Sequence, residues 1–227
     1  MGICIYCRKD SSNSIEKPHI IPEGFMKNDI TLPIGVECDG CNNYASKLEQ
    51  SFIHHNRIWV PIMFLQAPGK SGKIRKNLGF YKAGEEKGKV TFSFPEKWVT
   101  KDTNGIHVQS PNPKEFNELK FRRCLGHITL NYIAWKLGWN VALESRFDNL
   151  RQFVRYGSRE KMWPYGQVSF EDMKFRTKLS IGLMEEACGL IVRIESYIDD
   201  FFIDPLNEGH LEKFVNKQDG KECHYFQ

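Results

Sequence analysis

Two pairs of cysteines near the N-terminus constrain this chain of 227 residues more than any other feature. They are Cys4 and Cys7, followed by Cys38 and Cys41, and two residues separate the members of each pair. Zinc binds four thiolates in a tetrahedron, and each CxxC turn supplies two of them at a suitable separation. The alternative is two unrelated pairs of free thiols. We expect a structural Zn²⁺ on the four cysteines, with Gly40 helping the second turn to curl around it.

The residues between and after the cysteine pairs predict a small folded module. "HIIP" (19–22) and "TLPIGVE" (31–37) are typical of short extended segments. From Asn42 to Asn56 the sequence predicts a helix, because Ala45, Leu48 and Phe52 recur at helical spacing. A segment of roughly 50 residues is short for an apolar core, so a metal ion would stabilise it.

The net charge of +4 hides a strongly basic middle section. Residues 56–163 contain 20 Lys and Arg against 9 Asp and Glu, whereas residues 164–227 contain 7 against 12. A basic section between more acidic ends favours a polyanionic partner, most commonly nucleic acid. A lysine-rich solvated surface without a partner would have the same composition.

The N-terminal quarter resembles the HNH endonucleases, which have a ββα-metal fold and, in one type, a structural four-cysteine zinc. The resemblance covers about residues 3–53 and rests on "CIYC", "EKPHIIPEGF", "GVECDGCNN" and the helix that follows. It implies that His19 is a general base, which takes a proton from the water that attacks a phosphodiester of DNA. It also implies that Asn42, directly after the last cysteine, helps to hold a catalytic Mg²⁺ or Mn²⁺.

Two departures from the family pattern weaken the catalytic match. Many relatives have a metal-binding residue just before the catalytic histidine, and this chain has Pro18 there. The asparagine that the family has five residues before the second cysteine pair falls on Pro33. Other side chains that could take the place of the missing ligand are Glu16, Glu23 and Asn43.

Two basic segments are candidates for contact with a nucleic-acid backbone, which requires positive charge rather than exact geometry. One is a predicted helix near 146–156, on which Arg151 and Arg155 share a side. The other is a Gly- and Lys-rich loop with Lys70, Lys73, Arg75 and Lys76. A plain solvated loop is the alternative for the second segment.

The rest of the chain predicts a mixed α+β domain. "KVTFSF" (89–94) alternates as a half-buried strand does, and an apolar stripe from Phe121 to Trp139 predicts a core helix that ends at Gly138. Strands are expected within 174–204, with a hairpin turn near Gly189, and the polar tail after Asn207 is expected to be loosely held. We therefore divide the chain into a zinc module (1–55) and a larger α+β part (56–227), which grips substrate or dimerises.

Three functions remain open at this point. The first is a metal-dependent DNA endonuclease, for which restriction or phage defence would be a suitable role. The second is a catalytically degenerate zinc-knuckle protein that only binds nucleic acid, which Pro18 favours. The third is a structural or toxin–antitoxin-like interaction module, whose partner would be an accessory protein or a second copy of the chain. No apolar run approaches 18 residues and no signal pattern begins the sequence, so we expect a cytoplasmic protein without a membrane partner.

Overall fold

The structure is a computed structural model of the chain. It describes residues 2–22, 30–55, 58, 82–86, 89–93, 99–103, 105–108, 116–169, 180–186, 189–196, 199–215 and 222–227. The described part is a mixture of helices and antiparallel sheet, which confirms the predicted α+β class.

The described helices and strands follow one another in runs along the chain. The helices are α1 (Asp39–Ile53), α3 (Glu118–Lys136), α4 (Trp139–Ala142), α5 (Asp148–Tyr156) and α6 (His210–Val215), with a 3-10 turn, η2 (Ser145–Phe147). The strands are β1 (Lys82–Glu86), β2 (Lys89–Ser93), β3 (Val99–Asp102), β4 (Gly105–Val108), β5 (Tyr165–Ser169), β6 (Ser180–Glu186), β7 (Gly189–Glu195), β8 (Asp199–Ile203) and β9 (Glu222–Phe226). In chain order, β1 to β4 come between α1 and α3, and β5 to β8 come between α5 and α6. No described helix is long and apolar enough to cross a membrane.

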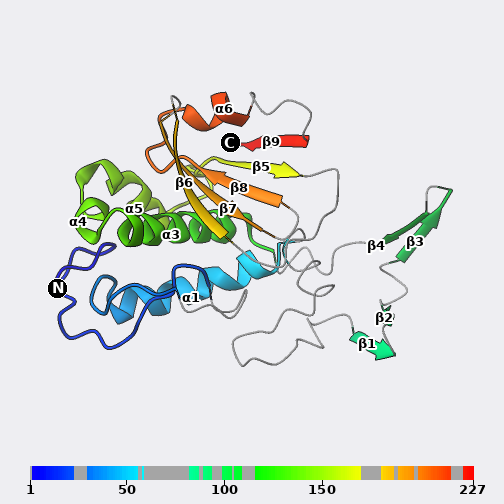
Figure 1. The fold of residues 1–227 in the computed structure, drawn as a ribbon, viewed down its shortest axis with the longest axis horizontal. Helices are drawn as coiled ribbons and strands as arrows, with labels where there is room; N and C mark the ends of the chain where they lie inside the picture. Colours follow the sequence, from blue (N-terminus) through cyan, green and yellow to red (C-terminus); the bar gives the residue numbers. More distant parts are fainter. Residues whose placement is uncertain are drawn as a thin grey trace.

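A five-stranded antiparallel sheet in the order β6-β7-β8-β5-β9 lies between two layers of helix (Figure 1). Successive side chains of a strand point to opposite faces. In β8, Phe201 and Ile203 belong to the core shared with α1 and α3, whereas Phe202 packs with Leu211 and Phe214 of α6. The central strand β8 is therefore buried on both faces, which explains why its apolar residues Phe201, Phe202 and Ile203 are consecutive.

Helices α1 and α3 pack together under the sheet (Figure 1). The rings of Phe52 on α1 and Phe121 on α3 stack with centroids 5.7 Å apart, and Phe201 of β8 lies 6.5 Å from Phe52. One hydrophobic cluster extends from Ile5 beside the first cysteine pair through this aromatic contact to the sheet. The N-terminal module and the larger part of the chain thus share a core.

Two glycines set the path of the helices that follow. Gly126 on α3 faces α5, and a Cβ there would lie 2.9 Å from Val154 and 3.1 Å from Leu150, so only glycine allows this close approach. Gly138 has φ of 105°, which other residues rarely adopt, and it separates α3 from α4. The predicted end of the helix at Gly138 is confirmed.

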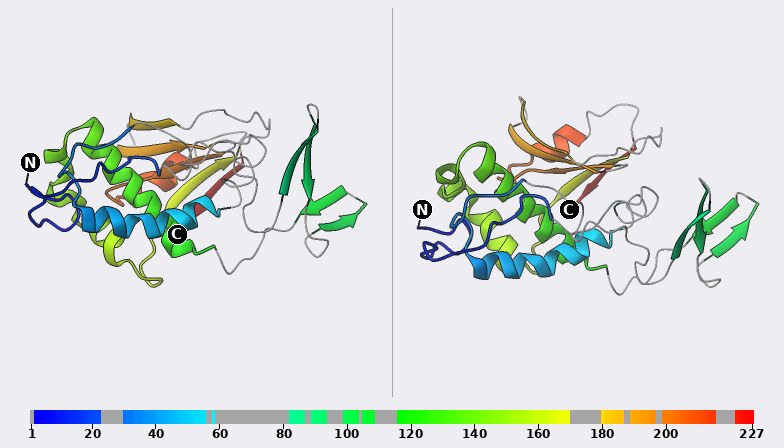
Figure 2. Two further views of the ribbon diagram at one scale, coloured as in Figure 1. Left: turned by 90° about the horizontal axis from the view of Figure 1, so that it is seen from below. Right: turned by 60° about the horizontal axis from the view of Figure 1, so that its bottom comes forward.

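Strands β1 and β2 form one antiparallel hairpin, and β3 and β4 form another. Both hairpins lie to one side of the helices and the five-stranded sheet in every view (Figures 1 and 2). The predicted strand in "KVTFSF" corresponds to β2.

Most of the predicted elements are present, with shifted ends. The helix expected from Asn42 begins at Asp39, so Gly40 lies in its first turn and has open space around it. The stripe on α3 is buried at Phe121 and three further positions, but Trp135 is 48% exposed and Trp139 belongs to α4. The predicted hairpin corresponds to β6 and β7.

The prediction for the C-terminal tail was wrong for its described residues. Residues 210–215 form α6, and 222–226 form β9, which pairs with β5 along its whole length. Strand β5 itself was not anticipated. The tail therefore completes the sheet and covers one of its faces.

Candidate metal centre

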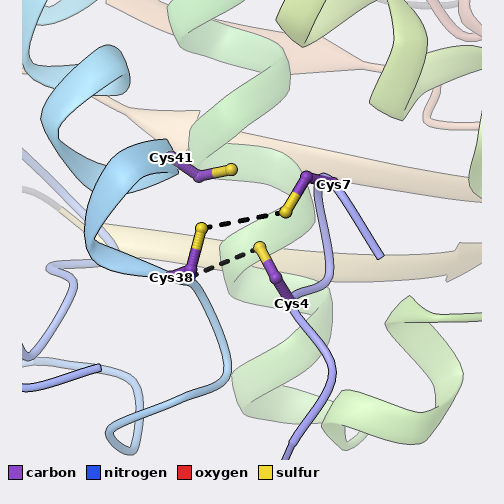
Figure 3. Close-up of side chains that lie close together, drawn as sticks. All are labelled: Cys4, Cys7, Cys38 and Cys41. Carbon is purple, nitrogen blue, oxygen red and sulfur yellow. Dashed lines mark hydrogen bonds between the residues drawn. The ribbon is translucent and has the colours of Figure 1, made fainter. Parts of the chain in front are cut away.

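Four sulfur atoms converge between the N-terminal loop and the start of α1 (Figure 3). The Sγ atoms of Cys4, Cys7, Cys38 and Cys41 all lie within 4.8 Å of one another, and those of Cys7 and Cys38 are 3.8 Å apart. A zinc ion with Zn–S bonds of 2.3 Å requires sulfur separations of about 3.8 Å. The donor set therefore fits a tetrahedral structural zinc, and we call these residues the four-cysteine centre.

The local backbone explains why the sulfurs converge. Cys38 precedes the first residue of α1, and its carbonyl accepts hydrogen bonds from the amides of Cys41 and Asn42, which brings Cys41 back over the same turn. The amides of Tyr6 and Cys38 donate to Cys4 Sγ at 3.4 and 3.3 Å. Amide donors of this kind stabilise a ligating thiolate and fix its direction.

The thiols do not titrate alike. A hydrogen bond from the Cys41 thiol lowers the pKa of Cys4 to about 4, even though burial opposes this shift. The same hydrogen bond raises the pKa of Cys41, and burial raises the pKa of Cys38. Cys4 is thus the favoured thiolate of this pair, and a zinc ion would bind all four sulfurs as thiolates.

Arg155 contributes a positive charge beside this centre. Its Nη1 donates to Cys41 Sγ at 2.7 Å, although α5 is far from Cys41 in the sequence. Burial opposes the charged guanidinium, but Cys41 in its thiolate form, the form that a zinc ion would bind, raises the pKa of Arg155. Zinc with four thiolates carries a charge of −2, and Arg155 offsets part of it.

Next to the four-cysteine centre, the two predicted extended segments meet as a minimal hairpin. His19 and Thr31 form an antiparallel bridge, flanked by hydrogen bonds from the Ile20 amide to Ile30 O and from the Leu32 amide to Pro18 O. Helix α1 follows this hairpin directly. His19 is half-buried on the first of the two segments.

The structure brings Glu16 and Asn42 together. The amide Nδ2 of Asn42 donates to Oε2 of Glu16 at 2.6 Å, so a carboxylate from the loop before His19 meets the first turn of α1. Pro18 is buried and has no side-chain ligand atom. Asn43 is exposed one position further along α1, and Glu23 lies outside the described residues.

A buried polar network from α3, which the sequence did not reveal, supports this region. His127 Nε2 lies 3.1 Å from a carboxylate oxygen of Glu37, and both side chains are buried. The hydroxyl of Tyr6 lies 2.8 Å from Oδ1 of Asn131 and 3.0 Å from the carbonyl of His127. The Asn131 amide also donates to the carbonyl of His19 at 3.3 Å. One turn of α3 thus binds both cysteine loops and the first extended segment.

The residues predicted to contact a nucleic-acid backbone fall into two groups. Arg151 is only 4% exposed, and its guanidinium binds the carbonyls of Ile5 and Ala142 and the carboxylate of Asp148. It lies inside the fold and does not share an exposed face with Arg155, so we do not retain it as a backbone contact. The other predicted set, Lys70, Lys73, Arg75 and Lys76, lies outside the described residues.

The fold and the site together define an α+β protein with a four-cysteine centre suited to a metal ion. Comparisons with protein-family models, with curated proteins and with solved structures find no match to this chain.

Proposed function

We propose that this protein is an HNH-type, metal-dependent endonuclease that hydrolyses phosphodiester bonds of DNA. The observation that carries the proposal is the contact between Asn42 and Glu16, a carboxylate three residues before His19 in the chain. The four-cysteine centre and the hairpin followed by α1 agree with the resemblance in residues 3–53. The basic section 56–163 suits a DNA partner.

His19 acts as the general base in this proposal. It accepts a proton from water while the water oxygen bonds to phosphorus and the bond from phosphorus to the leaving oxygen breaks. The leaving oxygen takes a proton from solvent. A histidine suits this step because its unperturbed pKa lies close to neutral pH.

Glu16 and Asn42 would hold the divalent ion. The Asn42 amide nitrogen is committed to Oε2 of Glu16, so the amide oxygen and the second carboxylate oxygen are the donors left for a hard cation such as Mg²⁺ or Mn²⁺. When bound, such an ion stabilises the negative charge on the phosphate and on the leaving oxygen. Glu16 would thereby supply the carboxylate that Pro18 cannot.

Plasmid nicking with Mg²⁺ or Mn²⁺ tests the proposal. We expect His19→Ala to lose about 10²- to 10⁴-fold in rate, the usual contribution of a general base, and the exposed control His224→Ala to nick like wild type. Glu16→Gln keeps an acceptor for Asn42 but removes a charge, so it should raise the metal concentration needed for half-maximal nicking. Nicking by His19→Ala at the wild-type rate would overturn the proposal.

A nucleic-acid-binding protein without catalysis is the second candidate. The buried Pro18, whose carbonyl is committed to the Leu32 amide, favours it. Wild-type protein that binds DNA at low salt but does not nick it with either metal would establish this alternative.

A further inference from the structure

Helix α5 has an outward face that the proposed catalytic site does not use. Its inward residues Leu150, Phe153 and Val154 are buried against α3 and its neighbours. Asn149, Gln152 and Tyr156 are exposed and follow one another at spacings of three and four residues, so they form one stripe. Tyr156 is 71% exposed, which is unusual for a large aromatic side chain.

Two open cavities adjoin along this stripe, and Gln152 and Tyr156 line both of them. The first measures about 310 Å³ and reaches the four-cysteine centre, where Cys7, Arg8 and Arg155 line it. The second measures about 550 Å³ and extends to the turn near Asn207. Both volumes fall in the range of small-molecule sites. We call the two cavities together the α5 groove.

The first cavity has two accessible guanidinium groups in its lining. Arg8 and Arg155 line it together with the carboxylate of Asp148, whereas Arg151 is buried and bound to Ile5, Ala142 and Asp148. Arg8 is 45% exposed and already binds Asp148, and Arg155 donates one nitrogen to Cys41. The remaining guanidinium donors of Arg8 and Arg155 can therefore bind one phosphate group, but not several phosphates in succession.

The remaining lining suits flat, polar-edged rings. The guanidinium of Arg155 lies 5.2 Å from the centroid of the Tyr156 ring, so it backs the ring while most of the ring stays open to solvent. The second cavity adds the exposed amide of Asn149, and the edges of the buried rings of Phe153 and Trp163 form part of its lining. Aromatic rings that stack on bases, beside amides that can bind base edges, are the usual surface for unpaired nucleotides.

We propose that the α5 groove binds single-stranded nucleic acid, with a backbone phosphate at Arg8 and Arg155 and the adjoining base stacked on Tyr156. The proposal rests on the proposed function only for its choice of a nucleic-acid ligand. Paired bases cannot present their faces to a protruding ring, so the groove selects unpaired over duplex strands. It would hold a frayed or displaced strand next to the zinc centre, through residues that differ from His19, Glu16 and Asn42.

The test is the binding of a labelled eight-nucleotide thymidine strand to the full-length protein, followed by fluorescence anisotropy without added Mg²⁺ or Mn²⁺. We expect Tyr156→Ala to weaken binding by about 5- to 150-fold, the range found when a stacking aromatic is removed. Tyr156→Phe keeps the ring and should bind within about threefold of wild type. Trp135→Ala, at an exposed aromatic on α3, is the matched control and should bind like wild type. Circular dichroism and zinc content establish that each variant is folded.

The outcomes separate this proposal from the proposed function. If the wild type nicks plasmid but does not bind the single strand, or if Tyr156→Ala binds it as well as Trp135→Ala does, the α5 groove proposal is overturned and the nuclease proposal stands. If the single strand binds with the expected pattern but plasmid is never nicked, the groove proposal stands alone. A matching eight-base-pair duplex should bind more weakly than the single strand, and tighter duplex binding would also contradict the groove proposal.

Discussion

The side-chain amide of Asn131, in the middle of α3, donates a hydrogen bond to the backbone carbonyl of His19, 112 residues earlier in the chain. The same side chain accepts from the hydroxyl of Tyr6 in the first cysteine loop. Asn131 is completely buried, and its hydrogen bond with Tyr6 is shielded from water. Helix α3 therefore fixes the position of the segment that carries His19 relative to the four-cysteine centre.

Removal of this side chain is expected to destabilise the protein measurably. Asn131→Ala deletes two buried hydrogen bonds and should lower the free energy of unfolding by about 1–3 kcal/mol, because buried polar partners lose their bonds. Urea unfolding of the variant checks this, with the exposed Lys136→Ala on the same helix as the control. If the nuclease proposal is right, the nicking rate of Asn131→Ala should also fall while DNA affinity is unchanged. Equal unfolding midpoints for the two variants would contradict the role of Asn131.

Loss of one zinc ligand should disturb more than the N-terminal module. Cys38→Ser is expected to abolish stoichiometric zinc, and hydrogen exchange should quicken in 2–22 and 30–55. The Tyr6 hydroxyl binds Asn131, and Glu37 binds His127. Hydrogen exchange should therefore also quicken in the central turns of α3. Cys223→Ser on β9, outside the centre, should keep its zinc. A Cys38→Ser protein with full zinc and wild-type exchange is incompatible with this assignment.

Local signals explain which features the sequence predicts. The two CxxC pairs and the helix with Ala45, Leu48 and Phe52 depend on short spacings, and the structure contains both. Strand β5 was missed because "YGQVS" has little apolar alternation and is held as a strand by its pairing with β8 and β9 on either side of it. Glu37 lies 90 residues from His127, and Ile5, one of the partners of Arg151, lies 146 residues away, so these contacts with the N-terminal loops could not be read from local spacing.

The buried pair of His127 and Glu37 should make stability depend on pH. Burial disfavours the imidazolium, but the negative charge of Glu37, with smaller contributions from Glu49 and Cys4, outweighs it and raises the pKa of His127. A histidine whose folded pKa exceeds its unfolded value of about 6.5 stabilises the fold fully below that pH. This stabilisation is lost as the pH rises through the folded pKa.

We therefore expect His127→Gln to cost about 3–5 kcal/mol at about pH 6, as removal of one partner from a buried ion pair does, and less as the pH rises towards 9. The measurement is the difference in unfolding free energy between wild type and variant across that range. Because both proteins contain the other titratable groups, their contributions cancel in this difference. A difference that stays constant with pH would mean that His127 is neutral in the folded protein.

Two glycines in helices offer a matched pair that tests the packing of α3 on α5. Gly126→Ala places a methyl group 2.9 Å from Val154 and 3.1 Å from Leu150, and we expect such overpacking to cost about 1–3 kcal/mol. Gly40→Ala, in the first turn of α1 with open space around it, should instead stabilise the protein by about 0.5–1 kcal/mol, because alanine favours the helix. Thermal unfolding of the two variants should therefore shift in opposite directions. If Gly126→Ala unfolded at or above the wild-type temperature, α5 would not lie as close to α3 as the structure has it.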